Sequence, residues 1–159
     1  MNETEYISSI IPKQKNIALI AHDNKKSELI EWVSRNKEVL STHQLCGTGT
    51  TARLITEKTS LPVKGYKSGP LGGDQQIGSR IAEGEINFTV FFWDPLGNQP
   101  HDPDIKALLR IAVVYDIPIA TNRATADFLL NSHYMHNEYE HQIFDYSKII
   151  TARTDNMKL

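Results

Sequence analysis

The fold is decided by the stretch NIALIAHDNKKSELIEWVSRNKEVL, residues 16–40. Its first six residues are almost all apolar, which predicts a strand at 16–21 that is buried on both faces. Beyond a short polar segment, apolar side chains recur at helical spacing, which predicts an amphipathic helix over Ser27–Leu40. A doubly buried strand that leads into such a helix is typical of a parallel sheet covered by helices.

The same alternation of apolar and amphipathic segments continues to residue 131. The further predicted strands are 44–46, 63–66, 88–93 and 117–121, and the helices that follow them are 51–59, 74–83, 104–115 and 124–131. Five βα units in succession predict an α/β fold, with a doubly wound, Rossmann-like parallel sheet of about five strands. The periodicity weakens in the tail, residues 132–159, which we expect to pack late in the fold or against a neighbouring subunit.

Length and composition fit a single domain over residues 1–159, because 40% of the residues are hydrophobic and 23% are charged. The longest mostly apolar run, Phe88–Trp93, is far shorter than the roughly 20 residues of a membrane helix. The N-terminal segment has no signal-peptide pattern, so we expect a cytoplasmic protein without membrane contact. The single cysteine, Cys46, excludes an internal disulfide and a Cys-based zinc site.

The net charge of −2, from 17 basic and 19 acidic residues, offers no general attraction to nucleic acid. An anionic ligand must therefore be held locally. In a doubly wound sheet, ligands bind beyond the carboxyl ends of the strands. We expect the site in the polar segments that follow the five strands, which are 22–26, 47–51, 68–76, 94–104 and 122–123.

The segment Gly47–Thr51 leaves a predicted strand and opens a helix. Free backbone N–H groups, hydroxyl donors and the positive end of the helix dipole suit a phosphate group there. A turn that only caps its helix is an equally good interpretation. The segment also matches a dinucleotide fingerprint through Ala52, but the acidic residue that would bind a ribose is missing.

Asp74 follows two glycines at the start of a predicted helix. The commoner interpretation is a helix N-cap, and the alternative is a general base. A helix N-terminus lowers the basicity of a carboxylate, so Asp74 can act as a base only if a dry site raises its pKa again.

His101 lies between two prolines and next to acidic residues. It could belong to an acid/base pair or, less readily, to a metal site, because a metal needs three or four ligands. Asp102 and Asp104 could equally cap the following helix. Lys26 is either a solvated charge or a counter-ion of a phosphate group.

Five blocks of sequence carry a resemblance to a known family. They are His22-Asp23 with Lys26, Thr48-Gly49-Thr50-Thr51, Ser68–Gln76, Phe91–Leu96 and Pro100–Asp104. In this order, within a match from about Lys15 to Asp127, they closely resemble the methylglyoxal synthase family. Gly47 and Ala52 depart from it, since alanine and glycine are expected at these two positions.

The resemblance implies a lyase that converts glycerone phosphate (dihydroxyacetone phosphate) to methylglyoxal and inorganic phosphate without a metal or an organic cofactor. It also implies a cytoplasmic homohexamer that is inhibited by phosphate. Asp74 would be the catalytic base and His101 would act near the substrate oxygens. The implied substrate-binding residues are His22, Lys26, Thr48, Gly49, Thr50, Thr51, Ser68, Gly69 and, from a neighbouring subunit, Arg153. Supporting roles fall to Asp23, Asp94 and Asp104.

Two other functions fit part of the pattern. An aldose–ketose isomerase of triose phosphates would begin with the same proton abstraction. A non-catalytic module that senses small effectors, similar to the regulatory domain of carbamoyl phosphate synthetase, would need the phosphate-binding turn but neither Asp74 nor His101. The presence of both features favours the lyase.

Overall fold

The computed structural model describes residues 5–157. At its centre lies a parallel sheet in the order β4-β3-β2-β5-β6. Its strands are β2 (Asn16–Ala21), β3 (Gln44–Thr48), β4 (Lys64–Tyr66), β5 (Phe88–Phe92) and β6 (Ile119–Ala120). The predicted five-stranded, doubly wound sheet is therefore confirmed.

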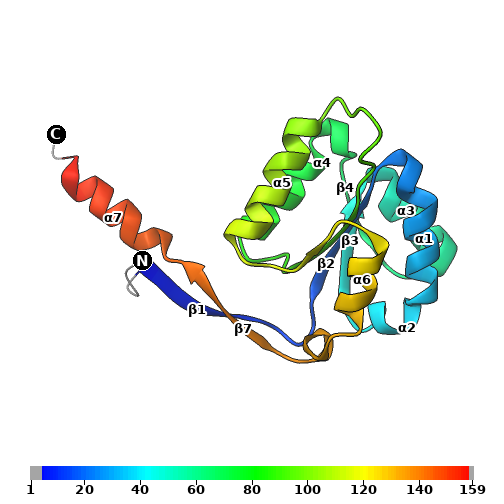
Figure 1. Cartoon of the computed structure of the whole chain (residues 1–159), viewed down its shortest axis with the longest axis horizontal. Helices are drawn as coiled ribbons and strands as arrows, with labels where there is room; N and C mark the ends of the chain where they lie inside the picture. The colour runs from blue at the N-terminus through cyan, green and yellow to red at the C-terminus, as the bar shows by residue number, and fades with distance from the viewer. Residues whose placement is uncertain (1–4, 158–159) are drawn as a thin grey trace.

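Helices cover both faces of this sheet (Figure 1). One face carries α1 (Lys26–Arg35), α3 (Gly49–Thr59) and α6 (Arg123–Leu130), and the other carries α4 (Gly73–Ala82) and α5 (Asp102–Val114). Alternate residues of β2 belong to opposite cores, with Ile17 and Leu19 on the α1 side and Ile20 on the α4 side. Both faces of the strand are buried, and this is why residues 16–21 read as a continuous apolar run.

The predicted helix over Ser27–Leu40 is two helices in the structure, α1 and the short α2 (Lys37–Leu40). The break falls at Asn36, whose side-chain amide donates a hydrogen bond of 2.8 Å to the carbonyl oxygen of Trp32. Such a local side-chain bond offers the backbone an alternative to the helical ladder. The apolar periodicity continues across the break because Leu40 still faces the same core.

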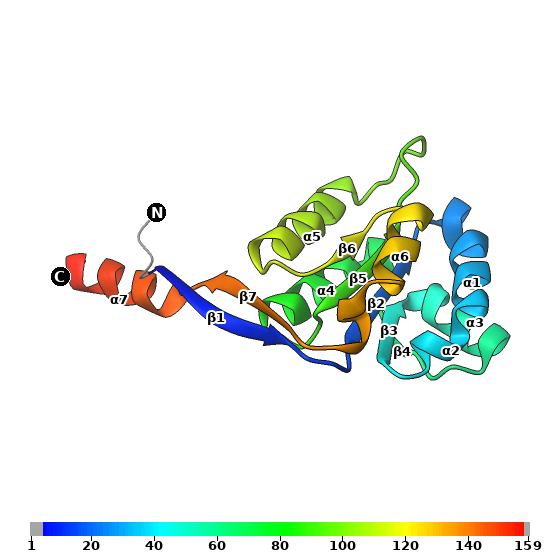
Figure 2. The same cartoon turned by 60° about the horizontal axis from the view of Figure 1, so that its bottom comes forward.

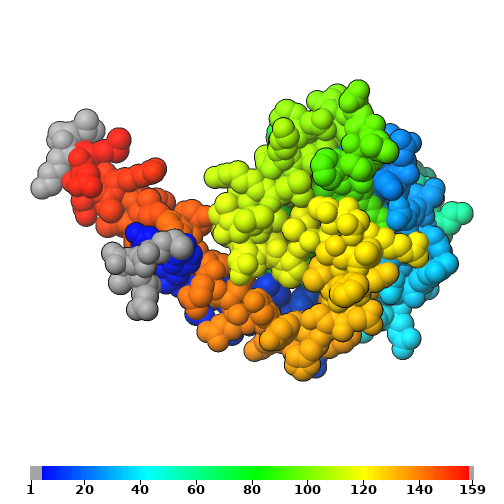
Figure 3. All heavy atoms as spheres, in the orientation of Figure 1, coloured from blue at the N-terminus to red at the C-terminus, as the bar shows by residue number. Residues whose placement is uncertain are grey.

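The tail forms an arm together with the N-terminal segment. After the 3-10 helix η4 (His133–His136), β7 (Tyr139–Phe144) pairs antiparallel with β1 (Tyr6–Ile11), and α7 (Tyr146–Asn156) follows. We did not predict β1. The arm extends away from the α/β body, with α7 at its outer end (Figures 1 and 2). Figure 3 shows α7 standing clear of the body in the space-filling view.

Side chains at two places along the arm contact the body. His141 of β7 is buried, and its Nδ1 lies 2.9 Å from the carbonyl oxygen of Asp116 in the turn after α5. The ring of Tyr115 lies 5.7 Å from that of Tyr146 at the start of α7.

Among the described residues, no helix is long and apolar enough to cross a membrane.

Candidate active site

The carboxyl ends of the strands surround a pocket of about 210 Å³. It lies where the chain leaves the neighbouring strands β2 and β5 toward opposite faces of the sheet, which is the usual place for a ligand in this kind of fold. The predicted site residues that line it are His22, Asp23, Lys26, Thr48, Thr50, Thr51, Ser68, Gly69, Asp74 and His101. Four of the five polar segments expected to meet at this edge therefore contribute to the pocket.

Asp74 stands in the first turn of α4 and is 2% exposed. Two glycines bring the chain to this position. Gly72 has a φ of 98°, and Gly73 lies so close to the carbonyl group of Lys67 that no side chain fits there. Burial raises the pKa of Asp74, the charge of Asp104 acts in the same direction, and that of His101 opposes them. The raised pKa makes the carboxylate a stronger base than an ordinary aspartate.

His101 faces the same carboxyl group from the start of α5. Its Nε2 lies 3.5 Å from Oδ2 of Asp74, and both side chains are buried. A Cβ atom at Gly69 would lie 2.9 Å from Nε2 of His101 and 3.2 Å from Oδ2 of Asp74. Only a glycine therefore lets this loop close over the pair. His101 itself takes the N-cap position of α5, one residue before the aspartate expected there.

His22 follows β2 and is 5% exposed. Its Nδ1 accepts a hydrogen bond of 3.0 Å from the backbone N–H of Asp94. Its ring stands edge-to-face on that of His101, with centroids 5.7 Å apart. Burial is the main cause that lowers the pKa of His22, and His101 lowers it further. The imidazole is thus held in one orientation at the wall of the pocket.

Three buried polar atoms at this pocket have no hydrogen-bond partner within the described part of the chain. They are Nε2 of His22, Oδ2 of Asp74 and Nδ1 of His101. Buried polar atoms are nearly always hydrogen-bonded in native proteins, and exceptions point to a function or to an absent ligand. The three residues therefore form an arrangement suited to a polar ligand.

The N-terminus of α3 forms a further part of the pocket wall. Gly49 has a φ of 32°, and a Cβ atom there would lie 2.8 Å from Cα of Ser68, so the two loops approach closely. The hydroxyl-bearing residues Thr48, Thr50 and Thr51 line the pocket, and the side chain of Thr48 does not cap its helix. Lys26 also lines the pocket, and its Nζ lies 2.6 Å from Oδ1 of Asp23. Free N–H groups, hydroxyl groups and an ammonium group suit a phosphate.

Four predicted site residues do not line the pocket. Gly49 shapes the turn as described. The Asp94 carboxylate accepts hydrogen bonds from Asn24 and from the backbone N–H of Leu96, and thus braces its own loop. Asp104 accepts one from Gln75. Arg153 is exposed on α7, in the arm.

Sequence reasoning missed part of the wall. Gln99 and Pro70 line the pocket, and Ile20, Ala21 and Phe91 form its apolar floor. Gln99 lies on the same loop as His101, and Pro70 follows Gly69, so their positions within the polar segments were the available signal. The floor residues lie near the ends of β2 and β5. Their apolar side chains predicted only buried strands, and nothing in the sequence indicated that they also line a pocket.

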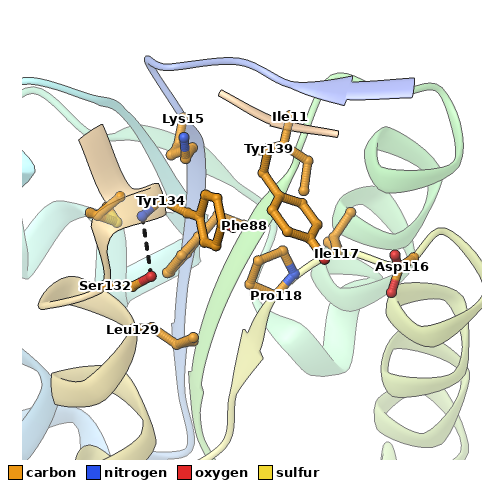
Figure 4. A pocket seen from close by; sticks show the side chains of 11 residues that line it. Ile11, Lys15, Phe88, Asp116, Ile117, Pro118, Leu129, Ser132, Tyr134 and Tyr139 are labelled. Atoms are coloured by element: carbon orange, nitrogen blue, oxygen red, sulfur yellow. Dashed lines mark hydrogen bonds between the residues drawn. The ribbon is translucent and has the colours of Figure 1, made fainter. Parts of the chain in front are cut away.

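A second cavity, of about 370 Å³, lies near the amino ends of β5 and β6 (Figure 4). Its lining is mainly apolar and includes Phe88, Pro118, Tyr134 and Tyr139. The ammonium group of Lys15, on its wall, already donates to three backbone carbonyl groups. This cavity therefore has no free cation for a phosphate. Among the described residues, no group of three or more His, Cys, Asp or Glu side chains is placed to hold a metal ion.

Comparison with known proteins agrees with the geometry of the pocket. Residues 28–121 match the family model described as MGS-like domain. The chain is 61% identical over 143 residues to the methylglyoxal synthase of Clostridium acetobutylicum, covering 90% of this chain and 97% of that protein. It is 54% identical over 149 residues to the enzyme of the same name from Pectobacterium atrosepticum, covering 94% and 98%.

A solved structure leads to the same assignment. The crystal structure of methylglyoxal synthase from Elizabethkingia anophelis superposes with a TM-score of 0.85 at 48% sequence identity, and covers 91% of this chain and 95% of that one. Sequence identity at this level over nearly the whole length shows that the chain shares both the fold and the enzyme class of these proteins. The chain therefore belongs to the methylglyoxal synthase family of lyases.

Proposed function

We propose that this enzyme converts glycerone phosphate to methylglyoxal and inorganic phosphate. The observation that carries the proposal is the buried carboxyl group of Asp74, whose Oδ2 lies 3.5 Å from Nε2 of His101 in a pocket that also presents the N-terminus of α3. A phosphorylated ketose needs a base and a hydrogen-bond donor to oxygen at its ketone end, and a set of phosphate-binding groups, here called the phosphate cradle, at its other end.

Asp74 is the proposed base. It removes a proton from the hydroxymethyl carbon next to the ketone, and the electron pair of that C–H bond forms the enediolate. His101 stabilises the developing negative charge on oxygen, which is commonly the largest contribution to catalysis. The raised pKa of Asp74 supports this role, because burial overcomes the acidifying effect of the helix N-terminus.

The phosphate cradle decides the fate of the enediolate. The proposed binding groups are Lys26, the Thr48–Thr51 turn and the Ser68-Gly69 loop. Holding the C–O bond to phosphate perpendicular to the enediolate plane lets that bond overlap with the π system, so that it breaks and phosphate leaves with the electron pair. The remaining enol takes up a proton at its methylene carbon and becomes methylglyoxal.

We propose further that the chain acts as one domain in a cytoplasmic homo-oligomer, as in the hexamer that the family resemblance implies. The arm supports this, because α7 has no buried residue while Ile150 and Met157 are exposed. Arg153, exposed on the same helix, would reach the phosphate site of a neighbouring subunit. Inorganic phosphate would inhibit by occupying the same cradle.

The test is to incubate the purified protein with glycerone phosphate and to measure both a dicarbonyl product and free phosphate. Equal amounts of the two products are expected. Conversion to an aldose phosphate without phosphate release would identify an isomerase instead. Binding of phosphate without any turnover would indicate an effector-binding module.

A further inference from the structure

We propose that Asn24 is a positioning residue that keeps His22 as a neutral imidazole with its proton on Nε2, so that this N–H donates a hydrogen bond into the pocket. The inference starts from the bond between the backbone N–H of Asp94 and Nδ1 of His22, at 3.0 Å. Because a backbone N–H can only donate, Nδ1 must carry a lone pair, and the ring proton of the neutral imidazole is then on Nε2.

The Nε2–H group has no acceptor within the described residues, although His22 is 95% buried and lines the pocket. A buried donor without an acceptor points to an oxygen atom of the bound ligand. Edge-to-face contacts with the rings of Phe91 and His101, with centroids 5.1 and 5.7 Å away, oppose rotation of the imidazole. A neutral donor of this kind polarises a carbonyl oxygen without itself becoming an acid that protonates the substrate.

The backbone N–H of Asp94 is held in place by the side chain of the same residue. One carboxylate oxygen accepts from the backbone N–H of Leu96 at 3.1 Å, and the other accepts from Nδ2 of Asn24 at 3.0 Å. Asn24 belongs to the short 3-10 helix η2 (Asp23–Lys25), which begins directly after His22. The amide group of Asn24 therefore closes a ring of contacts, from His22 through the Asp94 backbone and carboxylate and back to η2.

The charges around His22 set the direction of the expected effect. The carboxylates of Asp94, Asp102 and Asp23 favour the imidazolium form, whereas burial and His101 oppose it. In the native loop Asp94 presents its N–H to Nδ1, and Asn24 keeps its carboxylate turned to η2. Once Asn24 no longer binds this carboxylate, the loop can turn the carboxylate toward Nδ1, which favours protonation of His22.

The test compares the wild-type protein with Asn24→Ala and Asn24→Asp, and uses Asn98→Ala, an exposed position on the Asp94 loop, as the matched control. Correlation of the imidazole nitrogens and carbon-bound protons by NMR, with labelled histidine, reports the tautomer and the titration of His22 directly. The same four proteins are assayed for phosphate release from glycerone phosphate as a function of pH. Melting temperatures show that each variant is folded.

We expect wild-type His22 at neutral pH to be protonated on Nε2 alone. In both Asn24 variants the imidazole should titrate about one pH unit higher, and the acid limb of kcat should move upward by the same amount. On the acid limb kcat should fall about tenfold, because a rise of one unit in the pKa of His22 reduces the neutral imidazole tenfold there. The loss at neutral pH and the change in KM should both be smaller, and Asn98→Ala should match the wild type.

A wild-type His22 protonated on Nδ1, or charged at neutral pH, would overturn the proposal. So would Asn24 variants that lose activity evenly at all pH values while His22 titrates as in the wild type, since that is the result of a purely structural role. The activity measurements rest on the proposed function, but the imidazole titration does not. If the wild-type protein releases no phosphate, the proposed function fails and the titration alone decides the role of Asn24.

Discussion

The α/β body and the arm of this protein bury their apolar residues to very different extents. In β2, five of six residues are buried, and they supply both cores of the sheet. In α7 no residue is buried, and Ile150 is 65% exposed. Fully burying one aliphatic side chain stabilises a protein by about 1.5–3 kcal/mol. Burial of apolar side chains therefore stabilises the body strongly and α7 very little.

This difference has a consequence for how the two regions are stabilised. A two-stranded ribbon is marginally stable in water unless it packs against something else. The strands β1 and β7 form such a ribbon, in which Ile11 and His141 are buried while most other residues are not. Beyond it, Tyr146 of α7 contacts the ring of Tyr115 in the body. All residues that line the pocket belong to the body, whereas the arm leaves exposed the surface that the proposed contact with another copy of the chain would cover.

The largest effect is expected from Asp74→Asn, which removes the proposed base from the body and leaves the arm intact. Phosphate release and solvent-deuterium exchange at the substrate carbon should fall together by about 10³-fold or more. The two assays measured side by side provide the check. Continued exchange in the variant would exclude Asp74 as the base.

The same variant should be more stable than the wild type at neutral pH. Burial raises the pKa of Asp74 in the folded state, so the folded protein holds this proton more tightly than the unfolded chain does. Stability therefore falls as the pH rises above the pKa of the unfolded state, and an uncharged amide avoids this loss. A lower melting temperature of Asp74→Asn at neutral pH would contradict this account.

A smaller loss is expected from Gly69→Ala. The added methyl group would lie 2.9 Å from Nε2 of His101 and must push the loop away from Asp74 and His101, the proposed catalytic pair, so kcat/KM should fall about 100-fold. The control is Gly78→Ala in α4, where a Cβ atom meets nothing within 4 Å. The control should keep its activity and gain roughly 0.5–1 kcal/mol of stability, because alanine is the better helix former. Equal activity of the two variants would show that the tight contact at Gly69 is not needed.

The arm is tested by Ile150→Asp, with Ile150→Val as the conservative control. A charge at an exposed position should cost a single chain little, but in a subunit interface it should raise the dissociation constant about tenfold or more. Sedimentation and activity as a function of protein concentration measure this effect, and circular dichroism checks that the body stays folded. An unchanged mass and activity would place Ile150 outside any interface.

The smallest effect on activity is expected at the root of the arm. The Nζ of Lys15 donates to the carbonyl oxygens of Pro12, Lys13 and Asn137, and thereby ties the segment after β1 to the segment before β7. Lys15→Met leaves these oxygens without their donor and should reduce the free energy of unfolding by about 1–3 kcal/mol. Thermal unfolding measures the loss, and Lys13→Met, at an exposed neighbour, should show almost none. Comparable melting temperatures for the two variants would mean that Lys15 does not brace the arm.

Some features of the structure could not be predicted from local sequence. The strand β1 was missed because its partner β7 lies more than 120 residues away along the chain, and neither strand is buried on both faces. The break at Asn36 was missed because an apolar period of 3.6 residues continues across it. The helix α3 begins at Gly49, two residues earlier than expected, and Gly49 takes a φ of 32° that favours glycine.

By itself, the sequence determined the succession of βα units, the parallel sheet and the edge of that sheet where polar segments gather. These are local properties, since the period of apolar residues along a strand or a helix follows from its own backbone geometry. Only the tertiary structure decided that Asp74, His101 and His22, from three separate segments, meet around one pocket. It also decided that burial raises the pKa of Asp74 and lowers that of His22, because removal of water from a charged group depends on what packs around it.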